Sequence, residues 1–240
     1  MAVKPNIWLI SILGQTYSLS PYILLNGIGL IVGLFLIDSV LTKKLPDYQN
    51  VLYVAFVLSI VAGWAGAYFF NWLISNTSLL QSGFTFYGGL IGGLIFYIFF
   101  SYKYCDLKII WISLNAAVIP LLIAHAIGRV GCFFAGCCYG LPVAKDNLVN
   151  LFFDIHPTQL YESFFLFSLA LFLFKVEKKH PLSLVYFYFI AYGVFRFLIE
   201  FLRGDPRIFF YGLSTSQWIS LIFVFTTIGF VIYKRWRYKI

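Results

Sequence analysis

The chain has 240 residues, of which 61% are hydrophobic and only 11% are charged. A soluble domain carries about 25% charged residues, so this composition excludes a soluble surface and predicts an integral membrane protein. The net charge of +8 does not indicate nucleic acid as a partner. The basic residues stand at the ends of apolar runs, where they set membrane orientation and contact anionic membrane lipids.

Continuous apolar runs predict an all-α fold, a seven-transmembrane-helix bundle that forms a single domain over residues 1–240. In chain order, the expected spans are Pro21–Thr42, Val51–Ile74, Phe84–Tyr102, Leu107–Ile127, Thr158–Phe174, Pro181–Leu202 and Tyr211–Tyr233. The interrupted apolar segment before them, Ile7 to Leu19, is expected to lie at the membrane interface.

Basic residues mark one side of this bundle. Eleven of the 17 lysines and arginines follow spans one, three, five and seven: Lys43, Lys44, Lys103, Lys108, Lys175, Lys178, Lys179, Lys234, Arg235, Arg237 and Lys239. The positive-inside rule makes that side cytoplasmic, with the C-terminus there and the N-terminus outside. The connections Ser75–Gly83, Gly128–Pro157 and Arg203–Phe210 then lie at the outer face, and the longest of them is expected to be a packed loop over residues 128–157.

Arginines near the outer face point to an anion-binding site. A charge at membrane depth costs about 2.5–3.5 kcal/mol on insertion scales, so such residues mark functional sites. Arg196, Glu200 and Arg203 are spaced to share one helical face. Glu200 can neutralise only one arginine, and Arg129 has no acid near it in the sequence. Because guanidinium matches phosphate oxygens in bidentate fashion, a phospholipid headgroup is the expected ligand.

Cys132, Cys137 and Cys138 have CxxxxCC spacing, and Cys105 lies apart on the cytoplasmic side. Zinc sites usually use paired CxxC clusters or histidines, so the spacing predicts no metal. A disulfide, a reactive thiol and simple packing of small apolar side chains all remain open.

Two further polar stretches lie at the starts of predicted spans. His156 precedes Pro157, and the cluster around it could bind a headgroup or move protons, or simply begin the helix. The run from Phe86 to Gly93 offers a small-residue face for close helix packing, with Tyr87 at its start.

Together these motifs resemble the prolipoprotein diacylglyceryl transferase family. Five stretches carry the resemblance, in the family's order and over nearly the whole chain: Tyr87 to Gly92, Gly128 to Gly140, His156 to Glu162, Phe195 to Arg203, and Leu213 to Trp218. The family also has seven spans with the N-terminus outside.

The resemblance implies an enzyme that moves the diacylglyceryl group from phosphatidylglycerol to the lipobox cysteine thiol of a prolipoprotein signal peptide, in a bacterial cytoplasmic (inner) membrane with the active site toward the outer face. It implies no cofactor and no metal. The expected catalytic residues are Arg129, Arg196, Glu200, His156 and Tyr87. The expected headgroup-binding residues are Arg129, Arg196, Arg203, Tyr22, Gly140 and Cys132.

Three positions depart from the family's pattern. Tyr87 stands where the family has a histidine, Cys132 where it has an asparagine, and Cys137 where it has a glutamate. Tyrosine, with an ordinary pKa near 10, is a poor base at neutral pH. Two alternatives therefore stay open: a divergent paralogue that transfers a lipid group to another acceptor, and a non-enzymatic lipid-binding or transport protein. A membrane thiol oxidoreductase is a third class, but such enzymes typically carry a CxxC pair, and the spacing here is CxxxxCC.

Overall fold

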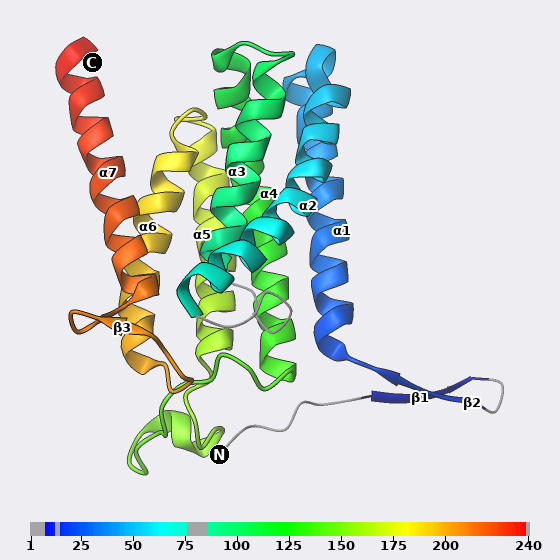
Figure 1. Ribbon diagram of the computed structural model, residues 1–240, viewed down its shortest axis with the longest axis vertical. Coiled ribbons are helices and arrows are strands. Elements are labelled where there is room, and N and C mark those ends of the chain that lie inside the picture. Colours follow the sequence, from blue (N-terminus) through cyan, green and yellow to red (C-terminus); the bar gives the residue numbers. More distant parts are fainter. Residues whose placement is uncertain (1–7, 13–14, 76–85, 239–240) are drawn as a thin grey trace. The chain divides into compact units, whose positions relative to one another are not determined.

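The computed structural model describes residues 8–12, 15–75 and 86–238, and helices dominate them (Figure 1). Seven α-helices lie within these ranges: α1 (Pro21–Lys44), α2 (Gln49–Ser75), α3 (Phe86–Tyr102), α4 (Leu107–Phe134), α5 (Thr158–Glu177), α6 (Leu184–Ile199) and α7 (Thr215–Tyr238). Three short 3₁₀ helices accompany them: Pro46–Tyr48, Leu148–Leu151 and Glu200–Leu202. Each predicted span corresponds to one α-helix, which confirms the all-α prediction. Residues 84–85 of the third predicted span and residues 76–83 of the connection before it lie outside the described residues.

Six of the described helical segments are long and apolar enough to cross a membrane, and they contain α1, α2, α4, α5, α6 and α7. The chain is therefore a multi-pass membrane protein. Helix α3 is apolar throughout but has only 17 residues. The seventh span and the orientation of the termini remain predictions.

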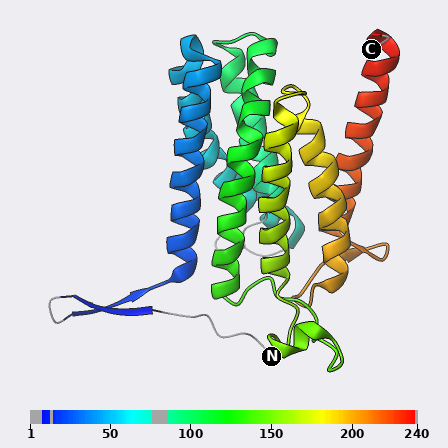
Figure 2. The same cartoon turned by 180° about the vertical axis from the view of Figure 1, so that it is seen from behind.

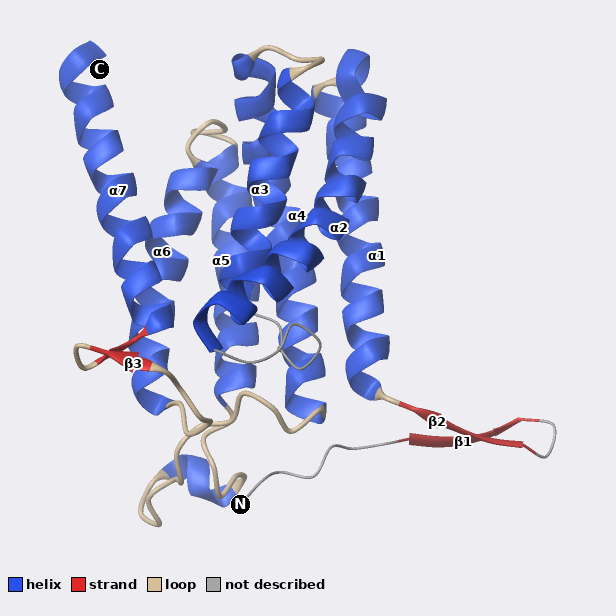
Figure 3. Ribbon diagram, viewed as in Figure 1, coloured by secondary structure: helices blue, strands red, loops and turns tan. Residues whose placement is uncertain are grey.

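Two short antiparallel hairpins interrupt the helical pattern (Figure 3). Strand β1 (Trp8–Ile12) pairs with β2 (Gln15–Leu19), and β3 (Phe209–Phe210) pairs with β4 (Leu213–Ser214). Tyr211 and Gly212 turn the second hairpin with φ of 49° and 78°, as a type I′ turn requires. The last helix consequently begins at Thr215, four residues later than predicted.

Helix α4 continues to Phe134. The loop that was predicted over residues 128–157 therefore begins seven residues later than predicted. Residues 128–134 contain no proline, and the charge of Arg129 is compensated by an ion pair with Glu162. His125, Arg129 and Cys132 therefore occupy one face of a single helix, at positions i, i+4 and i+7.

Helix α6 is shorter than its predicted span at both ends. It begins at Leu184 because residues 178–183 turn the chain out of α5, and it tightens into a 3₁₀ turn over Glu200–Leu202. Arg203 is already extended, with φ of −78° and ψ of 133°. The prediction that Arg203 shares a helical face with Arg196 and Glu200 is therefore wrong.

The backbone divides into two compact units, residues 1–33 with 118–240 and residues 34–117. In the first, α5 and α6 lie side by side, as Figures 1 and 2 both show, around a core that includes Leu122, Leu166 and Tyr188. In the second, the core includes Leu52 and Tyr97, whose hydroxyl lies 2.6 Å from Ser113 Oγ.

Candidate active site

Glu162, in the second turn of α5, is the centre of a buried charge cluster and is only 2% exposed. Arg129 of α4 approaches it most closely, with Nη2 2.9 Å from Oε2, and Arg196 Nη1 of α6 lies 4.0 Å from the same oxygen. Tyr192, one turn before Arg196, donates its hydroxyl hydrogen to Oε1 at 2.9 Å. His125 Nε2 lies 3.7 Å from Oε1. Residues of two helices, α4 and α6, thus converge on one carboxylate of α5.

A second group of charges continues from Arg196. Its Nη2 lies 3.0 Å from Glu200 Oε2, which bears out the predicted i, i+4 pair, and Arg207 Nε lies 3.1 Å from Glu200 Oε1. Arg203 donates to Asp205 through Nε and Nη2 at 2.7 and 2.8 Å, in the bidentate geometry of an arginine–carboxylate fork. Asp205 also lies 3.4 Å from Arg207.

The cluster carries more positive than negative charge. Four guanidinium groups meet three carboxylates in these ion pairs. Two buried donors, Arg129 Nε and Arg196 Nη1, have no hydrogen-bonded acceptor among the described residues. Because a buried charged donor without a partner costs free energy, the arrangement favours an anion with several acceptor oxygens.

The two arginines beyond the helices have opposite pKa shifts. Burial acts to lower the pKa of Arg203, but the hydrogen bonds to Asp205 outweigh it, and the pKa is raised above its ordinary value. Burial, with repulsion from Arg203, lowers the pKa of Arg207. Among the described residues, Arg203 pairs with Asp205 alone, whereas Arg207 pairs with both Glu200 and Asp205.

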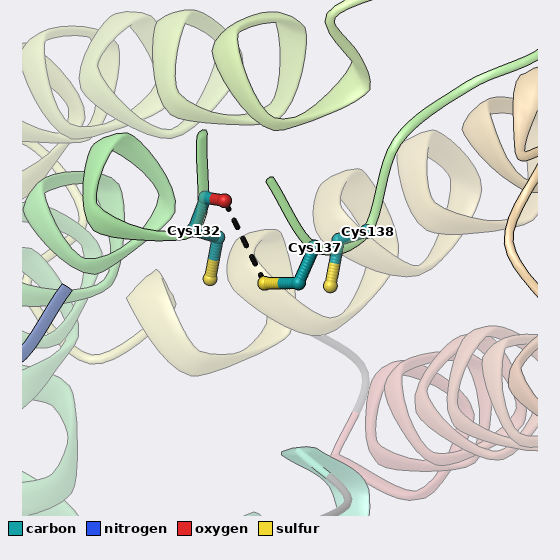
Figure 4. A group of neighbouring side chains, drawn as sticks. All are labelled: Cys132, Cys137 and Cys138. Atoms are coloured by element: carbon teal, nitrogen blue, oxygen red, sulfur yellow. Dashed lines mark hydrogen bonds between the residues drawn. The ribbon is translucent and has the colours of Figure 1, made fainter. Parts of the chain in front are cut away.

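Three cysteine sulfurs gather beside Arg129. Those of Cys132, Cys137 and Cys138 all lie within 4.8 Å of one another, and Figure 4 shows the Cys137 side chain directed toward Cys132. Arg129 Nη1 lies 3.6 Å from Cys132 Sγ. Hydrogen bonds from the Cys132 and Cys137 thiols lower the pKa of the Cys138 thiol, with Arg129 and Arg203 acting in the same direction. The cysteine spacing predicted no metal site, and it did not indicate that the three sulfurs lie together.

Position 140 has to be a glycine because two other backbone segments pass close to it. Its N–H donates to the carbonyl of His156 at 3.0 Å, and it bridges Arg203 on the other side. A Cβ at this position would lie 2.6 Å from His156 Cβ and 2.7 Å from the Leu202 carbonyl oxygen, so only glycine fits. The Cys–Cys–Tyr–Gly stretch is thereby tied to the end of its own connection and to the chain that follows α6.

The other predicted site residues are placed differently. Tyr22, in the first turn of α1, is within electrostatic range of Arg129 and the three thiols. His156 Nδ1 lies 3.2 Å from the Tyr161 hydroxyl, and no ion pair among the described residues joins it to the arginine cluster. Tyr87 is buried near the start of α3, in the second compact unit.

Comparisons with known proteins identify the family of this chain. The family model for prolipoprotein diacylglyceryl transferase matches residues 8–233. The chain belongs to the prolipoprotein diacylglyceryl transferase family. It is therefore an enzyme of the transferase class.

Three relatives illustrate the similarity, and each is named phosphatidylglycerol–prolipoprotein diacylglyceryl transferase. The Clostridium tetani protein is 34% identical, over 89% of this chain and 91% of its own. The second such protein of Clostridium perfringens is 32% identical, over 88% and 90%. The Streptococcus pneumoniae protein is 35% identical, over 88% and 87%.

Sequence reasoning missed several members of the site of this transferase. Glu162 was noted only as part of the polar cluster behind His156, and Tyr192, Asp205 and Arg207 were not among the predicted site residues, although all four take part in the ion pairs and hydrogen bonds above. Glu162 had a usable signal, because it is an ionisable residue inside an apolar span. Asp205 and Arg207 lie in the polar stretch that follows Arg196, and they reach the cluster through the turn after the 3₁₀ helix.

Proposed function

We propose that this chain transfers the diacylglyceryl group of phosphatidylglycerol to the thiol of a lipobox cysteine in a prolipoprotein. In this reaction the acceptor sulfur attacks the glycerol carbon that bears the phosphate. A carbon–sulfur bond forms, the carbon–oxygen bond to phosphate breaks, and its electron pair leaves with the phosphate oxygen of glycerol phosphate. The relatives' names supply the donor and the acceptor class.

The surplus positive charge around Glu162 carries the proposal. Arg129 and Arg196 approach one carboxylate from two helices and keep buried donors without acceptors among the described residues. Phosphate oxygens match such donors, and the charge that develops on the departing phosphate would strengthen each hydrogen bond. A preorganised cluster of this kind stabilises the transition state more than the substrate.

Each site residue has a role in the proposal. Arg129 and Arg196 hold the phosphate, and Glu162 and Glu200 orient them. Tyr22 supplies a further headgroup contact, and the backbone crossing at Gly140 and the Arg203–Asp205 pair hold the connections beside the phosphate. His156, whose Nδ1 lies 3.2 Å from the Tyr161 hydroxyl, is the candidate for accepting the acceptor proton.

The proposed setting is the inner membrane of a bacterium, crossed seven times, with the N-terminus outside. The connection that carries Cys137 and Gly140 and the connection that carries Asp205 would then face the outer side, where a prolipoprotein arrives. The basic residues at the opposite helix ends support this orientation.

Complementation tests the proposal. The chain is expressed in a bacterium depleted of its own diacylglyceryl transferase, beside Arg129→Ala, Arg129→Lys and the control Lys145→Ala. Lys145 is an exposed basic residue of the same connection, so its loss removes a charge without touching the cluster. We expect rescue by the wild type and Lys145→Ala, weak rescue by Arg129→Lys, which keeps the charge but not the fork, and none by Arg129→Ala.

Failure of a well-expressed, membrane-inserted wild type would contradict the proposal as stated. The departures at Tyr87, Cys132 and Cys137 would then point to a paralogue with another acceptor. Equal rescue by wild type and Arg129→Ala would remove the arginine from its proposed role.

A further inference from the structure

The three thiols beside Arg129 come from two elements. Cys132 lies in the last turn of α4, and Cys137 and Cys138 follow in the connection to α5. Their sulfurs lie within 4.8 Å of one another, and the Cys137 thiol is 3.6 Å from the Cys132 carbonyl oxygen (Figure 4). All three are free and partly exposed. Cys105, the remaining cysteine, is buried in the other compact unit.

Helix α5 holds the two loop cysteines in place. Thr158 donates to the carbonyl of Cys138 at 2.6 Å, and Gln159 donates to the carbonyl of Cys137. Both donors are almost fully buried. Cys138 adopts a left-handed conformation with φ of 63°, which a residue with a Cβ adopts at a cost. The backbone is therefore fixed in the conformation that brings the sulfurs together.

Three sulfurs at this spacing suit a thiophilic cation. Zinc–sulfur bonds of about 2.3 Å at tetrahedral angles set sulfurs about 3.8 Å apart, so side-chain rotations that close the triad by no more than about 1 Å are sufficient. Zinc sites with three protein ligands leave the fourth position for water or substrate. Three thiolates around Zn²⁺ carry one net negative charge, and Arg129 lies 3.6 Å from the Cys132 sulfur to compensate it.

We propose that Cys132, Cys137 and Cys138 bind Zn²⁺, and that its fourth position takes the thiol of the acceptor cysteine. The acceptor's identity rests on the proposed function. A thiol that coordinates Zn²⁺ loses its proton, which passes to solvent, and the bound thiolate is the sulfur that attacks the glycerol carbon. The site supplies the activation that Tyr87 is poorly suited to provide. Because Arg129 contacts both Cys132 and Glu162, the thiol cluster adjoins the guanidinium that is proposed to hold the donor phosphate.

Metal content is the first test. The wild type and the matched control Cys105→Ser are purified in detergent with a phosphine reductant, incubated with Zn²⁺ and freed of excess metal. We expect about one zinc ion per chain in both, and less than about a tenth of that in Cys132→Ser, Cys137→Ser and Cys138→Ser, because each loses one of three ligands. Zinc retained by the serine variants, or a reduced wild type that retains no zinc, would overturn the site.

Cobalt substitution tests the fourth position. Co²⁺ bound to thiolates gives a sulfur-to-metal charge-transfer absorption whose intensity rises with the number of thiolate ligands. A lipobox peptide with its cysteine should increase this absorption, and the same peptide with serine should leave it unchanged. An equal response to both peptides would overturn the role of the fourth position.

Transfer assays separate this proposal from the proposed function. If the triple serine variant still transfers lipid at the wild-type rate, zinc activation is wrong and the transferase reaction stands. If the wild type binds zinc and its cobalt form responds to the cysteine peptide, yet no lipid is transferred from phosphatidylglycerol, the site stands and the proposed function fails.

Discussion

The contact between α2 and α3 is made by glycines, whereas α4, α5 and α6 meet near Glu162 through charges. At the first contact, Gly66 packs against Gly88 and Gly92 so closely that a Cβ on Gly66 would lie 2.7 Å from the Gly88 carbonyl oxygen. At the second, Arg129, Glu162 and Arg196 are buried together. Small residues give close van der Waals packing between membrane helices without any polar group.

The difference separates stability from function. Packing alone can join helices in a membrane, and a buried ion pair is often no more stable than the apolar contact that could replace it. Charges at membrane depth are costly, so the Glu162 cluster is explained by what it binds rather than by what it holds together. Mutations at the two contacts should therefore affect different measurements.

Glu162→Gln should have the largest effect, because it leaves Arg129 and Arg196 close together with their shared carboxylate gone. We expect destabilisation by about 3–5 kcal/mol and loss of transfer. The free energy of unfolding of the purified protein measures the first, with Glu177→Gln at the far end of α5 as the control. The double variant with Arg129→Gln should recover part of the stability but no activity. A Glu162→Gln protein as stable as Glu177→Gln would contradict the central role of this carboxylate.

Gly66→Ala should destabilise the protein by about 1–3 kcal/mol, since the added methyl group meets backbone atoms of α3 that cannot move aside. Thermal unfolding should show a fall of about 2–4 °C per kcal/mol, with transfer retained by the folded fraction. Gly229→Ala is the matched control, because nothing lies within 4 Å of its added Cβ. Equal unfolding temperatures for the two variants would remove the steric argument.

Ser214→Ala should have the smallest effect, about 1 kcal/mol. Ser214 and Gln217 form a capping box at the start of α7, in which Gln217 N–H donates to Ser214 Oγ at 3.2 Å and Ser214 N–H donates to Gln217 Oε1 at 2.9 Å. Thermal unfolding beside Ser216→Ala checks it. A larger loss of activity than of stability would mean that this motif belongs to the site and not only to the helix start.

The sequence predicted the helices well because membrane spans are determined by local hydropathy, and each of the seven runs is helical. Helix ends were less predictable. Whether Arg129 lies in a helix or a loop depends on Glu162, which is 33 residues away and contacts it only in the folded chain. The start of α7 depends on a hairpin turn at Tyr211 and Gly212.

The site was predicted in part. Arg196 and Glu200 were found because helical spacing alone brings them together. The thiol cluster was not, because Cys132 and the two loop cysteines meet only after α4 ends and the chain turns at Gly136, which has φ of 66°. Spacing rules for metal ligands describe contiguous motifs and carry no information about such a turn.

The most direct measurement is a transfer assay with purified protein, phosphatidylglycerol and a lipobox peptide. It follows the thioether-linked peptide and glycerol phosphate together, for the wild type, Gly229→Ala and Arg129→Gln. The account predicts equal amounts of the two products from the first two proteins, and a rate about 10²–10³-fold lower for Arg129→Gln, because it loses a donor to the developing phosphate charge. A folded Arg129→Gln protein with the wild-type rate, or a folded wild type that forms neither product, would contradict it.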